Sequence, residues 1–567
     1  MTLGDQAGQG EFSPTAGNTR QCQSWRSRIY TRHPAISYNL EKQHARIAAK
    51  SGYVSANQWL SNQEKALKIG KSGLFCDSDD QEIKDYAEAK SRKTEKQIYE
   101  AYQLIGTKTQ TAKDQINDYL RNIVETAGLE YPLSKEAYSS RDMVAALTRI
   151  SDPAWWRKQL RKTASRQYEQ LARSTGAVSL SGGIYCSDYT LKRRQEAKRR
   201  NRRLLESLEA ENSQGQIYTL AELADLSTSN PINRRNELMV RIAGFEEYAK
   251  THHHTTASSD SHIRYMGLFL TLTTPSKYHA MKAASRNNGS RYAYPNPKYN
   301  GSTPREANDY LCDIWAQIRS EWDRREIHPF GFRMAEPHHD GTPHWHMILF
   351  IPENQLIETS YVFNHYALRE DGDEYGASEY RSKIVYIDPT KGSAAGYCAK
   401  YVAKNIDGFA IDADLYGRDA IKSAMRIEAW ASTWGIRQFQ QIGGPSVTVW
   451  REARRIGEGL VDVTLSPEAG AIIEAADAGD WETYTDLMGG AICPREDRPL
   501  RPMMVVRPTH NRYGEFPELL KGLLNGLNPI VTRVETWSIR PATTKTEDQS
   551  NWASALNSFY TEQPQAA

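Results

Sequence analysis

The chain has 567 residues, of which 72 are Lys or Arg and 69 are Asp or Glu, so its formal net charge is only +3. A chain of this length exceeds the size at which one hydrophobic core keeps growing, and we expect about three or four structural units. The near balance of charge excludes any argument for a polyanionic partner from the overall composition, so local clusters of charge have to be considered instead.

The cysteines and the apolar residues indicate the cellular compartment of the protein. Its six cysteines are scattered without a CxxC pair, which argues against a zinc ribbon or a disulfide scaffold and favours a reducing compartment. No run approaches 18 apolar residues, and the amino terminus lacks the charged-then-apolar pattern of a signal peptide. We therefore expect a cytosolic protein that does not bind a membrane.

The amino-terminal part carries no recognisable chemistry. Residues 1–20 are polar and predicted to be disordered, and residues 21–150 are predicted to form a helical region, to which the sequence assigns no function. Gly70-Lys71-Ser72 resembles the end of a phosphate-binding loop, but the glycine required five positions before Gly70 is Lys65. No complete nucleotide-binding loop is evident, so strand unwinding would have to come from a partner.

Residues 151–258 are predicted to form a basic helical region. A helix start is expected at Ser151-Asp152-Pro153, and residues 192–203 contain eight cations in twelve positions. A cluster of this kind can contact phosphates, although a solvated surface between helices is the alternative. Residues 251–260 read as a polar linker. The candidate DNA-binding residues are Lys192, Arg193, Arg194, Lys198, Arg199 and Arg200.

The pattern changes to strands after this region. Strands are predicted at Arg264–Thr273, Phe330–Glu336, His344–Ile351 and Lys383–Asp388, and a helix that opens with a capping box is predicted from about Thr303 to Arg325. This order predicts the α+β class, a sheet with helices to one side. We place this domain at residues 259–410, an α/β extension at 411–542 and a disordered tail at 543–567.

The most informative segment is His344-Trp345-His346. Because successive residues of a strand face opposite sides of a sheet, both imidazoles point to one face. Trp345, Met347 and Leu349 point to the other face, where they are expected to anchor the strand in a core. Two imidazoles held side by side on a rigid strand can bind a metal ion.

A predicted hairpin brings a carboxylate to the same place. The turn at residues 340–341 folds Glu336 back toward the histidines, where it can complete a triad of ligands with open positions for a substrate oxygen. The alternative is a salt bridge from Glu336 to Arg333 or to a nearby lysine. His338 and His339 fall in the turn and are read as loop residues.

A helix about 50 residues downstream carries the candidate nucleophiles. Tyr397 and Tyr401 are four residues apart and Lys404 is three beyond, so both phenols and an ammonium share one face. A phenol needs help to attack at neutral pH, and Lys400, Lys404 and a metal-polarised phosphate would supply it. Taken alone, the two tyrosines would more often be core aromatics of an amphipathic helix than nucleophiles, and the alternative for the lysines is ordinary solvated charge.

Together these segments resemble a known family. The run from Glu336 to His346, the run from Gly396 to Asn405, and Leu268–Thr273 look like the replication gene A protein family of temperate tailed phages, which belongs to the HUH endonucleases. The resemblance implies an HUH-type domain, with a central antiparallel sheet flanked by helices. It also implies a rolling-circle replication initiator, which nicks one strand at the phage origin, stays joined to the 5′ phosphate through tyrosine and later rejoins the ends.

The resemblance also implies a cofactor and partners. His344, His346 and Glu336 would hold Mg²⁺ or Mn²⁺, although the same ligands would also suit zinc. Expected partners are single-stranded or supercoiled phage origin DNA and a host helicase and polymerase, in the cytoplasm of a bacterial host. A plasmid relaxase or a transposase of the same superfamily, and a non-catalytic origin-binding protein, are the alternatives.

Overall fold

The structure is a computed structural model of the whole chain. It describes residues 16–106, 109–134, 138–256, 259–388, 390, 392–408, 418–457 and 465–542. The tail predicted at 543–567 and most of the disordered segment predicted at 1–20 therefore lie outside the described residues.

The chain divides into two compact units. The first comprises residues 1–183 with 283–295, and the second comprises residues 184–282 with 296–567. The domain boundaries that we expected at residues 150, 258 and 410 remain predictions.

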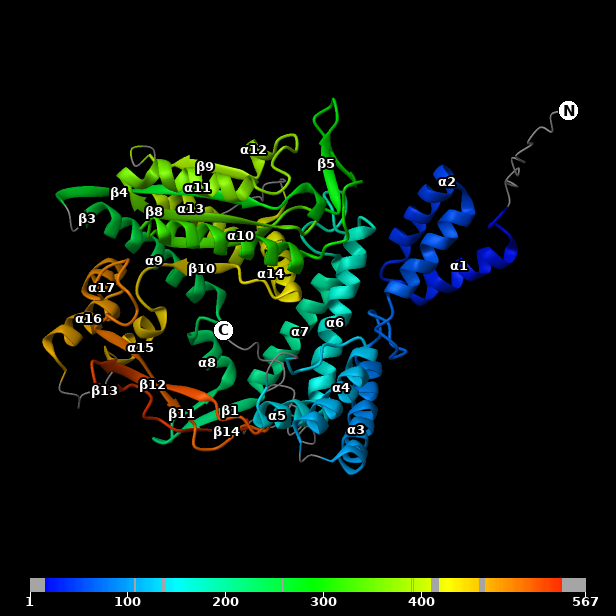
Figure 1. Cartoon of the computed structure of the whole chain (residues 1–567), viewed down its shortest axis with the longest axis horizontal. Coiled ribbons are helices and arrows are strands. Elements are labelled where there is room, and N and C mark those ends of the chain that lie inside the picture. The colour runs from blue at the N-terminus through cyan, green and yellow to red at the C-terminus, as the bar shows by residue number, and fades with distance from the viewer. Residues whose placement is uncertain are drawn as a thin grey trace. The chain divides into compact units, whose positions relative to one another are not determined.

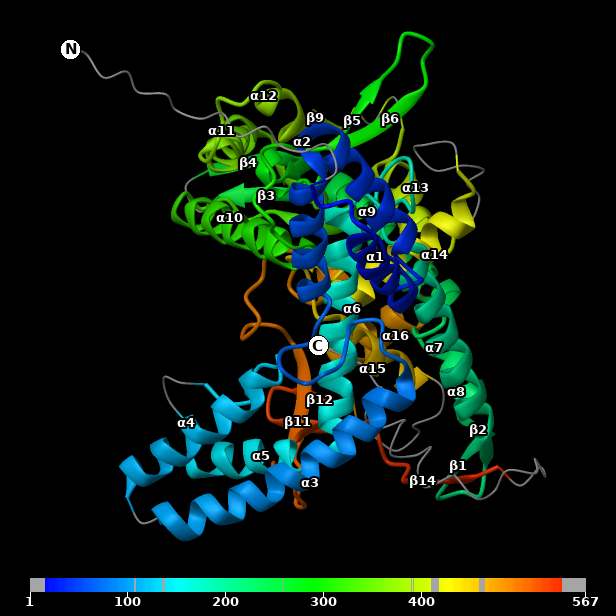
Figure 2. The same cartoon turned by 90° about the vertical axis from the view of Figure 1, so that its right-hand side faces the viewer.

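The first unit is helical over its described residues. Helix α1 packs on α2, and α3 packs on α6, with α4 and α5 beside α3, as Figure 2 shows. Asp79 caps α3 through a capping box with Glu82, and Asp152 caps α6 just before a proline at its first turn. The helices are α1 (Arg20–Arg32), α2 (Ser37–Ala66), α3 (Asp80–Ile105), α4 (Gln110–Thr126), α5 (Ser140–Ile150) and α6 (Pro153–Ser174), and the hairpin of β5 (Met281–Ser285) and β6 (Arg291–Pro295) falls mostly in this unit.

The second unit is built around an antiparallel sheet, whose strands lie side by side in Figure 1. Over the described residues its order is β10-β7-β8-β4-β3, and β9 pairs with the same side of β4 as β3. The strands are β3 (His253–Thr256), β4 (Ser259–Thr273), β7 (Phe330–Pro337), β8 (Pro343–Pro352), β9 (Ser382–Tyr386) and β10 (Phe439–Ile442).

Helices cover both faces of this sheet, so the expectation of helices to one side is wrong. One face packs its apolar residues, such as Phe332 and Ile348, against α9 (Pro231–Thr251) and α13 (Ala394–Ile406). The other face packs on α10 (Pro304–Arg324) and α11 (Leu356–Leu368). Trp345 lies on this second face, where its indole donates to Asn308 of α10. The predicted alternation along β8 is therefore confirmed.

The linker expected at residues 251–260 is a further correction. Residues 253–256 form β3, which pairs with the start of β4, and β4 itself begins before the predicted Arg264. The sheet also takes in β10, so it extends beyond the predicted range 259–410 at both ends.

The remaining elements of the second unit complete its core. Helices α15 to α17 and the sheet β11-β12-β13 contribute to the same apolar cluster as α9, and β14-β1-β2 form a small separate sheet. No helix of the described residues is long and apolar enough to cross a membrane. These elements are α7 (Asp188–Glu206), β1 (Leu208–Asn212), β2 (Ile217–Thr219), α8 (Leu220–Leu226), α12 (Ala377–Tyr380), α14 (Ala420–Trp434), α15 (Val447–Gly457), α16 (Pro467–Asp477), α17 (Trp481–Leu487), β11 (Leu500–Val506), β12 (Glu518–Asn525), β13 (Asn528–Val531) and β14 (Trp537–Pro541), with short 3₁₀ turns at Ser276–Tyr278 and Glu353–Gln355.

Candidate active site

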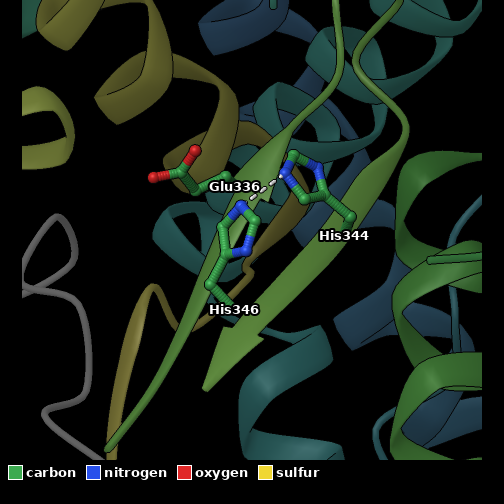
Figure 3. Close-up of side chains that lie close together, drawn as sticks. All are labelled: Glu336, His344 and His346. Atoms are coloured by element: carbon green, nitrogen blue, oxygen red, sulfur yellow. Dashed lines mark hydrogen bonds between the residues drawn. The ribbon is translucent and has the colours of Figure 1, made fainter. Parts of the chain in front are cut away.

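The predicted metal ligands lie together on neighbouring strands. Glu336 of β7 pairs directly with His344 of β8, and His346 follows two residues later, so the three side chains project from the same face of the sheet (Figure 3). One ligand atom from each lies within 4.8 Å of the other two, and all three residues are buried. The predicted hairpin therefore brings the carboxylate to the imidazoles.

The two imidazoles are arranged as neutral ligands. Burial lowers the pKa of His344 well below its usual value and lowers the pKa of His346 to about 4. Both imidazoles are therefore neutral at neutral pH. Their Nε2 atoms lie 3.0 Å apart. Thr271 Oγ1 lies 3.0 Å from Nδ1 of His346, and a hydroxyl that accepts the Nδ1 proton leaves Nε2 with its lone pair.

Two Nε2 lone pairs at this distance repel each other unless a proton or a cation lies between them. Two metal–nitrogen bonds of about 2.1 Å at a right angle separate their nitrogens by about 3.0 Å. Nδ1 of His344 has no hydrogen-bond partner among the described residues, so no hydrogen bond decides which ring nitrogen of His344 carries the proton. The donor set of two imidazoles and a carboxylate therefore fits a divalent ion.

Glu336 is held by the helix that carries the tyrosines. Lys404 Nζ lies 2.6 Å from Glu336 Oε2, and the Asn405 side-chain amide donates to Oε1. Burial alone would raise the pKa of Glu336, but the Lys404 ammonium and the hydrogen bonds hold it below its usual value. The salt bridge to a lysine, weighed above as the alternative to a metal-ligand role, is thus present, and the carboxylate stays ionised.

The tyrosines lie one turn apart on α13, which Ser393 caps. Their rings are 6.0 Å apart, and the ring of Tyr401 is 4.6 Å from that of His346. Burial raises the pKa of Tyr401, whereas Tyr397 is 47% exposed. The ring of Phe269 on β4 contacts both tyrosine rings.

Tyr397 and Tyr401 both line one cavity of about 500 Å³. The same cavity is lined by His344, His346 and Lys404, so a phosphodiester entering it would meet the imidazoles, the phenols and an ammonium. Lys400 is not among the lining residues. Its predicted catalytic role stays a prediction.

The candidate DNA-binding residues on α7 divide into two groups. Arg194 lies 2.6 Å and Lys198 3.6 Å from Glu428 of α14, so part of the cluster pairs two helices. Arg193 lies over the ring of Tyr189. The side chains at positions 192, 199 and 200 are exposed and available to a polyanion. DNA contact by this helix stays a prediction.

Sequence reasoning missed part of the cavity wall. The ring of His338 lies 4.1 Å from that of His344 and 5.0 Å from that of His279, and all three line the cavity. The sequence places His338 in the turn, and the residue does lie just beyond β7, so the loop interpretation holds but gave no indication of the cavity. Its position two residues after Glu336, directly beyond the end of β7, is the signal that could have placed it here. Asn405 was missed as well, since nothing local marks it as a partner of Glu336.

Comparisons with known proteins show which proteins this chain is similar to. The family model described as "Bacteriophage replication gene A protein (GPA)" matches residues 73–409, which include the histidines and tyrosines of the cavity. This chain is 40% identical over 423 residues to the replication gene A protein of Escherichia phage 186, a match that covers 72% of this chain and 58% of the relative.

Other curated relatives extend the same group. The replication protein of Haemophilus phage HP1 is 37% identical over 440 residues, covering 75% of this chain and 53% of the relative. A probable replication endonuclease from a prophage-like region of Salmonella paratyphi A is 30% identical over 408 residues, covering 69% and 49%. The chain thus spans about half the length of the relatives it matches. No solved structure matches it.

Proposed function

Because this chain belongs to the bacteriophage replication gene A protein family, we propose that it is the endonuclease that starts rolling-circle DNA replication. It nicks one strand of the phage origin at a defined site and rejoins the ends later. The observation that carries this proposal is the cavity that His344, His346, Tyr397 and Tyr401 line together, with Glu336 beside the two imidazoles. The antiparallel sheet beneath them would be of the HUH type.

Each group has a distinct chemical task in this proposal. His344, His346 and Glu336 hold the divalent ion, Mg²⁺ or Mn²⁺, which when bound polarises the scissile phosphate. A tyrosine hydroxyl attacks phosphorus and loses its proton, while the bond from phosphorus to the 3′ oxygen breaks and that oxygen takes up a proton. The Lys404 ammonium, which lines the cavity, offsets the negative charge that gathers on the phosphate oxygens.

The product is a 5′-phosphotyrosine ester and a free 3′ hydroxyl that a polymerase can extend. The ester keeps the energy of the broken bond, so rejoining by the reverse attack needs no nucleotide cofactor. Two phenols on one helix let one hold the first 5′ end while the other attacks the regenerated origin. A host helicase and polymerase, acting with this protein in the bacterial cytoplasm, would supply unwinding and synthesis.

Capture of the covalent intermediate tests the proposal. Purified protein is incubated with single-stranded phage DNA and Mn²⁺ and separated under denaturing conditions. Wild-type protein should form an SDS-resistant adduct, and the double variant Tyr397→Phe/Tyr401→Phe should form none. Tyr361→Phe is the matched control, because Tyr361 is exposed on α11 and does not line the cavity. An adduct that persists in the double variant would exclude these nucleophiles.

The exposed cations of α7 support one alternative, a protein that binds the origin without cutting it. Removal of the metal separates the two functions. EDTA should abolish nicking and spare much of the DNA binding if the protein is an endonuclease, whereas a purely binding protein nicks at no metal concentration. A plasmid relaxase or a transposase would share the chemistry, but the relatives are named replication proteins.

A further inference from the structure

Two exposed tyrosines stand at the mouth of the cavity. Tyr375 and Tyr380 line it together with Tyr397, yet their own exposed fractions are 107% and 67%. A tyrosine ring is a large apolar surface, and leaving it in water forgoes the stabilisation that burial would bring. Such rings beside a substrate cavity are available to stack on a ligand.

The segment that carries these rings is firmly held. The carboxylate of Glu374 accepts hydrogen bonds from the backbone and hydroxyl of Ser276 and lies 3.0 Å from Lys298 Nζ. Arg381, only 4% exposed, donates to the backbone carbonyls of residues 367, 370 and 371. Both ends of the tyrosine segment are therefore fixed, and a ligand that stacks there need not order it first.

The charged groups around Tyr375 and Tyr380 indicate which part of a nucleic acid can bind there. Lys277 pairs with Glu370 and Asp371, and Lys298 pairs with Glu374, so these cations are already engaged by acidic partners at the rim. A phosphate gains little attraction there, whereas the uncharged face of a base can stack on a phenol ring. The cavity itself is lined by a further cation at Lys383, which suits the phosphate backbone.

We infer that Tyr375 and Tyr380 form a base-stacking platform that grips unpaired nucleotides next to the scissile phosphate. The inference rests on the proposed function in one respect, namely that the cavity takes a DNA strand. Bases within a duplex are already stacked on each other, so the platform favours single-stranded DNA over the same sequence as a duplex. The platform thus gives the cavity a preference for melted DNA that does not depend on the metal or the nucleophiles.

The experiment compares two fluorescent 12-nucleotide probes, oligo(dT) and an abasic strand of the same phosphate spacing. Binding is measured by anisotropy in the Tyr397→Phe/Tyr401→Phe background with EDTA present, so that no adduct forms. We expect oligo(dT) to bind more tightly than the abasic strand. Tyr375→Ala and Tyr380→Ala should each weaken oligo(dT) binding by about 5- to 100-fold and leave abasic binding unchanged.

The controls separate stacking from other effects. Tyr375→Phe keeps the ring and should bind oligo(dT) within about twofold of the background protein, as should Tyr361→Ala on α11. Equal affinity of the background protein for the two probes, or unchanged oligo(dT) binding by Tyr375→Ala/Tyr380→Ala, would overturn the inference. Failure of the proposed function looks different, because the wild-type protein would then form no adduct on phage DNA while the platform still bound oligo(dT).

Discussion

Replacing Lys404 by methionine tests how the buried carboxylate is balanced. Lys404→Met removes the ammonium 2.6 Å from Glu336 and keeps a long side chain, and both side chains are nearly inaccessible, at 6% and 0% exposed. An unpaired buried carboxylate costs about 3–5 kcal/mol. In a large unit, a loss of 1 kcal/mol lowers the thermal midpoint by only about 2 °C. Without metal, the thermal midpoint of Lys404→Met should therefore fall by about 6–10 °C.

A divalent ion should reverse part of this loss. In the wild-type protein the ion has to draw Glu336 away from Lys404, whereas in the variant it meets a carboxylate without a counter-ion. We expect Lys404→Met to bind Mn²⁺ at least about 10-fold more tightly, which corresponds to about 1.4 kcal/mol. This is a fraction of the pair's energy because Asn405 still holds the other carboxylate oxygen. Saturating Mn²⁺ should then reduce the stability difference between the variant and the wild-type protein by about 1.4 kcal/mol.

Calorimetric titration with Mn²⁺ and thermal unfolding with and without the ion measure both effects. Lys400→Met is the matched control, since it removes an ammonium from the same helix outside the cavity. The reasoning is refuted if Lys404→Met binds Mn²⁺ no more tightly than the wild-type protein, because Lys404 would then not compete with the ion for Glu336.

Further predictions concern the neighbours of the site. Thr271→Val removes the hydrogen bond to His346 and should weaken Mn²⁺ binding by about 10- to 100-fold in titration, so unchanged affinity would contradict the orienting role. Trp345→Ala leaves a cavity in the core and should cost about 3–5 kcal/mol in denaturant unfolding, with a loss below 1 kcal/mol speaking against its packing role. Arg199→Ala/Arg200→Ala should lower the salt dependence of DNA binding by about two ion equivalents, and an unchanged slope would exclude contact.

The site was predictable where it depends on local periodicity. The alternation along β8 placed His344 and His346 on one face and Trp345 on the other, and the helical spacing placed Tyr397 and Tyr401 together. Each of these relations joins residues a few positions apart, and the geometry of a strand or a helix fixes them without reference to the rest of the chain. The capping box before α10 was found for the same reason.

What the sequence could not supply depends on contacts between distant segments. Lys404 and Asn405 reach Glu336 across 68 and 69 residues, and no local pattern selects that carboxylate from the chain's other acidic groups. The strand β3 consists of His and Thr residues without apolar alternation, so its identity comes from pairing with β4. The exposed Tyr375 lines the cavity because the fold places its loop there, and no local sequence pattern indicates this position.

The spacing of the tyrosines on α13 has a consequence for the order of events. Four residues along a helix correspond to a rise of about 6 Å, and the sheet holds His344 and His346 in one place beside it. Under the proposed chemistry a single ion cannot lie equally close to phosphates held by both Tyr397 and Tyr401. The two strand ends would therefore react one after the other. One end would stay bound as a phosphotyrosine ester while the other tyrosine attacks its phosphate.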